Sequence, residues 1–159
     1  MKKLFIAVMA IAALCACGNA EKKYLDYRGL SMGMPFKTFC DSLTARGFAI
    51  DSAKTDSDFA RVSMYHPTLN YRLMLAQRND TLVALQENYT ISTNDSTRQM
   101  WQQLHDGLEK ELDAWPDCPI LKDDHKQANF DTGDGIISVL LENTYTPSLT
   151  VRYTKKSDQ

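Results

Sequence analysis

The apolar residues of this chain change from helical to strand spacing twice, and this order of elements limits the folds open to it. The first helical pattern recurs at i, i+3, i+4 and i+7: Phe36, Phe39, Cys40 and Leu43. It predicts a helix from about Pro35 to Arg46, with Gly47 just past its end. The second pattern forms one stripe, with Trp115 as a further candidate: Trp101, Leu104, Leu108 and Leu112. It predicts a longer helix that is capped within 92–96 and stopped by Pro116.

Each helical pattern is followed by segments in which apolar and polar residues alternate, as they do in strands that bury one face. After the first helix the predicted strands are 59–64, 71–76 and 82–86, and after the second they are 120–122, 136–141 and 149–154. Asn79-Asp80 suits a two-residue hairpin turn, because both residue types tolerate the left-handed conformation. Turns are also predicted at His66-Pro67-Thr68 and at Asp123-Asp124.

The two halves of the chain align at one displacement of 67 residues, which pairs 70–77 with 137–144 and 81–88 with 148–155. Few residues are identical, so only the order of elements repeats. We therefore expect a single α+β domain, 26–156, made of two tandem α-β-β-β(-β) units at about 30–90 and 94–156. Its sheet would be mainly antiparallel, with both helices on one face. The alternative is a coincidence of spacing in a generic α+β domain.

This layout resembles two families of small secreted bacterial proteins. One is the tandem-repeat beta-lactamase-inhibitor-like fold. The other is the small outer-membrane lipoprotein of the barrel-assembly machinery, in which Gly-Met opens a short helix that ends at a Leu and a Gly, as Gly33-Met34, Leu43 and Gly47 do here. The chain lacks the Pro that follows the closing Gly in that family. Neither resemblance assigns functional residues to this chain.

The first 16 residues have the pattern of an export signal: a charged start, an apolar run over 4–14, and small residues. The run is short of the ~20 residues that span a bilayer. Leu14-Cys15-Ala16-Cys17 resembles the lipobox of bacterial lipoproteins, with Leu at −3, a small residue at −1 and the lipid-bearing Cys at +1. The resemblance implies cleavage after Ala16 and acylation of Cys17. The alternative is a plain secreted protein cleaved after Ala20.

An acylated Cys17 would hold the protein on a membrane permanently, because each buried methylene contributes ~0.8 kcal/mol. Residues 17–25 would form the tether. In many lipoproteins Asp after the acylated Cys causes retention at the inner membrane, whereas this chain has Gly18. By that resemblance we expect an outer-membrane lipoprotein, periplasmic or surface-facing, whose partners are the lipid anchor and another envelope protein.

Loss of the signal removes Lys2 and Lys3, so 16 basic residues stand against 20 acidic ones. The slightly anionic body has no basic stripe, and we expect no nucleic-acid partner. Cys40 and Cys118 remain. A disulfide between them is one interpretation, since the compartment is oxidising, and two separate thiols are the other.

No sequence pattern indicates catalysis. The histidines His66, His105 and His125 have no spacing typical of metal sites, and the motifs of serine hydrolases and phosphate loops are missing. The segment 131–135, Asp-Thr-Gly-Asp-Gly, has carboxylates that suit calcium, but not the EF-hand order, so we expect a glycine-rich turn. We therefore predict no catalytic residues, no metal and no cofactor.

A non-enzymatic, protein-binding envelope lipoprotein is the leading hypothesis. Two helices cover only one face of a sheet of seven or eight strands, so the other face would be open to solvent, where Tyr and Arg suit a protein-binding surface. The chain has seven tyrosines, mostly in or beside strands, and packing beneath a helix is their alternative place. The competing functions are a small periplasmic hydrolase or glycan-binding protein, and an inhibitor of a secreted hydrolase.

Overall fold

The computed structural model describes residues 25–119, 125–142 and 148–156. Within them the elements are β1 (Asp26–Tyr27), β2 (Leu30–Ser31), α1 (Phe36–Ala45), β3 (Ala49–Ile50), the 3-10 turn η1 (Ser52–Lys54), β4 (Arg61–Tyr65), β5 (Tyr71–Arg78), β6 (Thr81–Tyr89), α2 (Asn94–Leu112), β7 (Lys126–Asp131), β8 (Gly135–Glu142) and β9 (Ser148–Lys155). The export signal, Cys17 and the predicted strand 120–122 lie outside the described residues.

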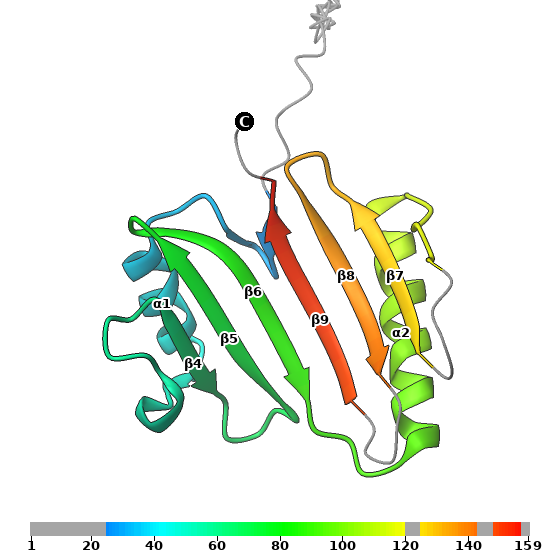
Figure 1. Ribbon diagram of the computed structural model, residues 1–159, viewed down its shortest axis with the longest axis horizontal. Coiled ribbons are helices and arrows are strands. Elements are labelled where there is room, and N and C mark those ends of the chain that lie inside the picture. The colour runs from blue at the N-terminus through cyan, green and yellow to red at the C-terminus, as the bar shows by residue number, and fades with distance from the viewer. Residues whose placement is uncertain (1–24, 120–124, 143–147, 157–159) are drawn as a thin grey trace, which may run out of the picture.

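Seven strands form one antiparallel sheet in the order β3-β4-β5-β6-β9-β8-β7, and β1 and β2 form a separate hairpin. Both α-helices lie behind the large sheet, α1 near β4 and β5 and α2 near β7 and β8, so its front carries no helix (Figure 1). The expected α+β class, with two helices and a mainly antiparallel sheet, is confirmed.

The end of α1 is fixed by Gly47, whose φ of +92° favours glycine. Its N–H donates to the Thr44 carbonyl at 3.0 Å, and the N–H of Phe48 donates to the Leu43 carbonyl at 3.1 Å. This pair of bonds is a Schellman motif, which satisfies the last carbonyls of the helix. A Cβ at position 47 would lie 2.7 Å from Nε2 of His66, so a side chain there would force the His66 ring to move.

The predicted limits of α2 are confirmed at its start, where the Thr93 hydroxyl accepts from the Ser96 N–H at 3.1 Å. At its end Asp113 adopts a left-handed conformation, with φ of +49°. The chain therefore leaves the helix axis before Trp115, whose side chain is 88% exposed. The extension of the apolar stripe to Trp115 is wrong.

The hairpin turn at Asn79 and Asp80 is confirmed, since both residues have positive φ, +51° and +57°. Four strands were not predicted. β1, β2 and β3 have two residues each, too few to show an alternation. In β7 only Ala128 and Phe130 are buried, between polar neighbours, so the apolar signal is weak.

The core lies between the sheet and the elements behind it. Phe39 and Leu43 of α1 and Trp101 of α2 are buried against the strands. Tyr27 of the β1–β2 hairpin contacts Phe39 and Tyr153, with ring centroids 6.4 Å and 5.4 Å apart. The hairpin thus covers part of the sheet beside α1. No helix among the described residues is both long and apolar enough to cross a membrane.

Candidate functional site

The helix-free side of the sheet, called the open face below, carries polar side chains in rows that cross six strands. Strand pairing brings these residues together from positions far apart in the sequence. The central row is Met74, Gln86, Arg152, Ser138 and Asn129, and it ends on β4 at Ser63, which is buried. The rows on either side are Arg61, Ala76, Ala84, Thr154, Ile136 and Asp131, and Tyr65, Arg72, Asn88, Thr150, Leu140 and Gln127. The face therefore offers both hydrogen-bond donors and acceptors, interspersed with apolar groups.

Arg152 lies at the centre of this face. Its Nε and Nη2 atoms donate to Oε1 of Gln86 at 3.2 Å and 3.0 Å, and Nε2 of Gln86 donates to Oδ1 of Asn88 at 2.6 Å. The other two arginines of the face form ion pairs: Arg61 with Asp56 at 3.0 Å, and Arg72 with Asp51 at 2.6 Å. Among the described residues no carboxylate lies within ion-pair distance of Arg152, so its charge is compensated only by an amide dipole.

A second polar network occupies the β7–β8 side of the open face. Oδ1 of Asn129 accepts from Nε2 of Gln127 at 2.8 Å and from Oγ of Ser138 at 2.7 Å. These bonds hold the side chains in place before any partner arrives. A surface ordered in this way loses less conformational entropy on binding.

Most of the described tyrosines lie on the core side of the sheet and not on the open face. Tyr27, Tyr71 and Tyr153 are buried beneath the helices or the hairpin, and Tyr89 is half-buried beside them. Tyr65 alone, among the described tyrosines, is exposed on the open face. Packing beneath the helices is thus the place that the fold gives most of these rings, whereas the expected arginines do lie on the open face.

Two of these tyrosines, Tyr27 and Tyr89, contact Glu87, a site that the sequence did not predict. Glu87 is 1% exposed and is the only fully buried charged residue among the described residues. Its Oε1 accepts from the Tyr27 hydroxyl at 2.9 Å and from Nη2 of Arg28 at 2.8 Å, and its Oε2 accepts from the Tyr89 hydroxyl at 2.8 Å. The available signal was a Glu two residues after Leu85, in phase with the buried side of β6.

These contacts fix the protonation of the cluster. Burial raises the pKa of Tyr27, Tyr89 and Tyr153 above the usual range of a phenol, and the charge of Glu87 raises it further. Burial lowers the pKa of Arg28, but Glu87 and the neighbouring phenols outweigh that effect and the net change is upward. These three phenols and the Arg28 guanidinium therefore stay protonated at neutral pH.

Cys40 and Cys118, the two candidates for a disulfide, are free thiols and lie toward opposite edges of the sheet. Cys40 is half-buried on α1, and exposed Cys118 follows the segment that pairs with the edge strand β7 (Figure 1). The structure therefore does not bring them together. Burial raises the pKa of the Cys40 thiol to about 11, with a smaller contribution from Asp41. A thiol in this state is a weak nucleophile at neutral pH.

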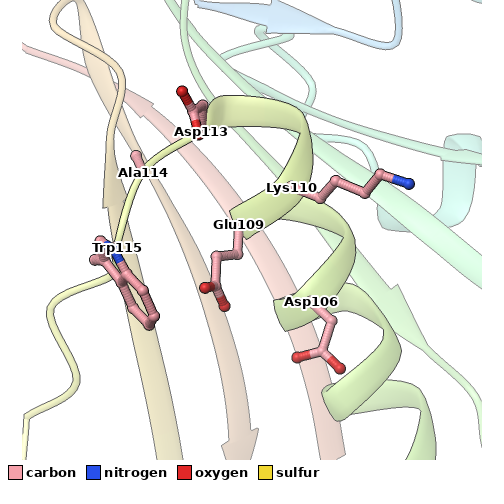
Figure 2. A pocket seen from close by; sticks show the side chains of 6 residues that line it. All are labelled: Asp106, Glu109, Lys110, Asp113, Ala114 and Trp115. Carbon is pink, nitrogen blue, oxygen red and sulfur yellow. The ribbon is translucent and has the colours of Figure 1, made fainter.

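Two of the hollows on the surface of the described residues hold groups that could bind or react. One, of about 410 Å³, lies at the end of α2 and is lined by Asp106, Glu109, Lys110, Asp113, Ala114 and Trp115 (Figure 2). The other, of about 320 Å³, is lined by Tyr65, His66, Leu69, Asn70, Tyr71, Arg72 and Thr90. The first contains no hydroxyl or thiol and the second no carboxylate. Neither of these hollows therefore combines the histidine, carboxylate and nucleophile that a hydrolase of the serine type needs.

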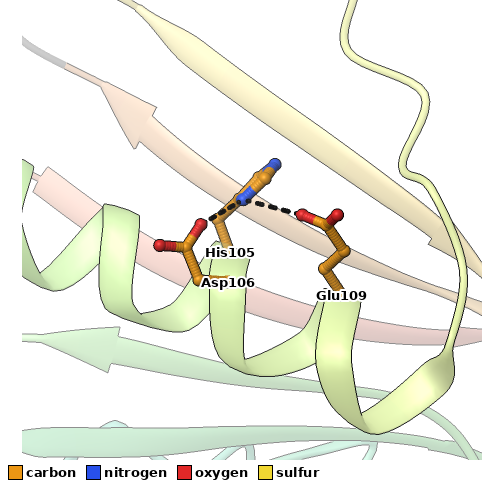
Figure 3. Close-up of side chains that lie close together, drawn as sticks. All are labelled: His105, Asp106 and Glu109. Atoms are coloured by element: carbon orange, nitrogen blue, oxygen red, sulfur yellow. Dashed lines mark hydrogen bonds and ion pairs between the residues drawn. The ribbon is translucent and has the colours of Figure 1, made fainter.

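The three histidines occupy separate elements: His66 the turn after β4, His105 the helix α2, and His125 the residue before β7. Nδ1 of His105 lies 2.9 Å from Oδ1 of Asp106 and 3.8 Å from Oε2 of Glu109 (Figure 3). This group does not match the sequence patterns of known metal sites, which are built on pairs of histidines or cysteines. A histidine followed by carboxylates one and four residues later was the available signal.

The segment 131–135 forms the turn between β7 and β8, as the glycine-rich pattern predicts. Gly133 has a φ of +85°, and its N–H donates to Oδ1 of Asp131 at 2.8 Å. Nζ of Lys156 contacts both oxygens of Asp131 at 2.8 Å. The carboxylate of Asp131 is thus already paired within the protein.

The side chains of the open face are the basis on which its role is inferred. Comparison with protein-family models, with curated proteins and with solved structures finds no match for this chain.

Proposed function

We propose that this chain is an envelope lipoprotein, anchored through acylated Cys17, that binds another envelope protein through its open face. The lipobox at 14–17 supports the anchor. Arg152 carries the binding proposal, because it places a positive charge, without a carboxylate partner among the described residues, at the centre of a hydrogen-bonding surface. A partner that presents an acidic side chain and free backbone amides would complement this surface.

The same proposal includes a finer description of the fold, two tandem units of one helix and three long strands. The rows Val62–Leu75–Leu85 and Ala128–Val139–Val151 are both buried and both cross three consecutive strands. They relate the units by displacements of 66, 64 and 66 residues, where the sequence alone suggested 67 throughout. Side chains alternate with a period of two along a strand. An even displacement therefore matches buried residues of one unit with buried residues of the other, whereas a displacement of 67 would match buried residues with exposed ones.

The antiparallel pairing of β6 with β9, the seam of the sheet, is consistent with a two-fold axis that relates the two proposed units. A two-fold axis through the Gln86–Arg152 pair would exchange Leu85 with Val151 and Glu87 with Tyr153, and these four residues do pair across the seam as Leu85–Tyr153 and Glu87–Val151. Arg152 therefore lies on the proposed axis between the two units. A seam of this kind is shared by both units, so it offers a binding centre that neither unit has alone.

Site-specific photo-crosslinking in intact cells tests the binding proposal. A photoreactive amino acid at Thr150, beside Arg152 on the open face, is expected to form one discrete adduct with a partner. The same amino acid at Gln103, which is exposed on α2, is expected to form none, because α2 lies on the other side of the sheet. Identification of the adduct by mass spectrometry gives the partner.

Arg152→Gln is expected to reduce the yield of the Thr150 adduct about tenfold, because a charge pair in a protein interface contributes several kcal/mol. Arg78→Gln, at the exposed end of β5, is the matched control and is expected to leave the yield unchanged. Equal yields from the two variants, or an adduct at Gln103 and none at Thr150, would contradict binding through the open face.

The lipid anchor makes a separate prediction. Cys17→Ser is expected to move the protein from the membrane fraction to the soluble fraction, because no acyl chain can be attached. Cys15→Ser is the matched control and is expected to remain with the membrane, since Cys15 leaves with the signal. Immunoblots of fractionated cells measure both. Membrane retention of Cys17→Ser would show that the proposed anchor is wrong.

A further inference from the structure

Three side chains with metal-binding atoms converge on the C-terminal half of α2. His105, Asp106 and Glu109 each offer one ligand atom, and these atoms all lie within 4.8 Å of one another (Figure 3). Their order places the imidazole and Glu109 one helical turn apart on the same side of the helix. The group differs from an acidic patch because an imidazole nitrogen lies between two carboxylates.

The imidazole of His105 is held in one orientation by its neighbours. Its ring stacks on Trp101, with centroids 5.1 Å apart and planes inclined by 28°, and meets the edge of Phe130 at 5.9 Å. Only 17% of the side chain is exposed. These contacts direct Nδ1 toward Asp106 and Glu109 before any ion is present. A ligand that is already oriented loses little entropy when it coordinates an ion.

We propose that His105, Asp106 and Glu109 bind one divalent transition-metal ion of the zinc type. Nitrogen and carboxylate ligands bind Zn²⁺ at about 2.0–2.2 Å, which separates two ligands of a tetrahedral ion by about 3.3 Å. The distances from Nδ1 to the two carboxylate oxygens, 2.9 Å and 3.8 Å, lie on either side of that value. Small side-chain rotations therefore suffice. The ion takes the lone pair of Nδ1, and the ring proton is then on Nε2.

The surroundings favour a cation and leave it accessible. The adjoining hollow, of about 410 Å³, is lined by the carboxylates of Asp106, Glu109 and Asp113 and by one ammonium group, that of Lys110. Figure 2 shows the Lys110 side chain pointing away from Glu109 and Trp115. Three negative charges against one positive charge attract a divalent cation. The hollow has room for the water molecules that would complete the coordination.

Titration of the full chain in detergent with zinc, with the heat of binding measured by calorimetry, tests this site. One ion per chain is expected. Asp106→Asn and Glu109→Gln change one ligand each at nearly constant shape and are expected to lower the association constant at least about tenfold, as loss of metal-site interactions does elsewhere. Glu111→Gln removes the same charge from an exposed position of α2 and is the matched control, with an expected change under about twofold.

Cobalt provides a second readout, since bound Co²⁺ is expected to give a visible absorption band that His105→Phe abolishes. Phenylalanine keeps the ring between Trp101 and Phe130, so the fold can be checked by circular dichroism and thermal unfolding. The proposal is overturned if Asp106→Asn and Glu109→Gln bind zinc as tightly as Glu111→Gln does, which would place the ion at Cys118 or another histidine. Failure to bind zinc at millimolar concentration would also overturn it. Neither result bears on the open face, which lies on the other side of the sheet.

Discussion

Replacement of Glu87 by alanine is expected to lower the free energy of unfolding by about 3 kcal/mol. The buried hydroxyls of Tyr27 and Tyr89 lose their acceptor, and a buried donor without a partner costs about 1–3 kcal/mol. Arg28 adds less, because half of its side chain is exposed and can regain water. Urea unfolding measures the change, and thermal unfolding is expected to show a midpoint about 10 °C lower.

Two variants make this prediction specific. Glu87→Gln retains one carbonyl oxygen as an acceptor, so its loss is expected to be about half as large. Glu142→Ala removes a carboxylate from the exposed end of β8 and is expected to change the free energy of unfolding by less than about 0.5 kcal/mol. If Glu87→Ala were no less stable than Glu142→Ala, the hydrogen bonds around Glu87 would not stabilise the fold.

Raising the pH from 9 to 11 is expected to destabilise the protein by about 4 kcal/mol. The folded-state pKa of Tyr27, of Tyr89 and of Tyr153 is raised, chiefly by burial, above the unfolded value of about 10. A raised pKa contributes stability that is fully present below the unfolded pKa and is lost as the pH rises above it. At pH 11 each buried phenol contributes a loss of about 1.4 kcal/mol. Urea unfolding at each pH measures the sum.

Tyr153→Phe and Tyr65→Phe separate this effect from general alkaline damage. Tyr153 is 8% exposed, and its replacement is expected to reduce the pH-dependent loss by about 1.4 kcal/mol. Tyr65 is 40% exposed on the open face, so its replacement is expected to leave the loss unchanged. The same loss in both variants would mean that buried phenols do not control alkaline unfolding.

Strand β6 connects the stabilising cluster to the proposed binding surface. Gln86 and Asn88 point to the open face, and Glu87 between them points to the core, because successive side chains of a strand alternate. The Arg28–Glu87 ion pair and the network of Gln86, Asn88 and Arg152 thus lie on opposite sides of the same backbone. We expect the ion pair to hold β6 firmly, so that the open face is presented with little distortion.

The features that depend on neighbouring residues could be predicted from the amino-acid sequence. Both helices follow from apolar residues spaced at about 3.6, and β4, β5, β6, β8 and β9 follow from alternation over five or six residues. The turn at Asn79-Asp80 and the end of α1 at Gly47 follow from backbone preferences of those residues. These are local signals, and each is complete within one segment of the chain.

The choice of which segments meet depends on the folded arrangement of the whole domain. The pairing of β6 with β9 places Gln86 beside Arg152, and docking of the first hairpin brings Arg28 to Glu87. Packing of α2 on the sheet fixes His105 between Trp101 and Phe130. A periodic pattern states which side of a segment is buried, but not which partner buries it, because strand order and register arise from contacts between residues distant in sequence. The strands of two residues were missed for the same reason, since their neighbours in space define them.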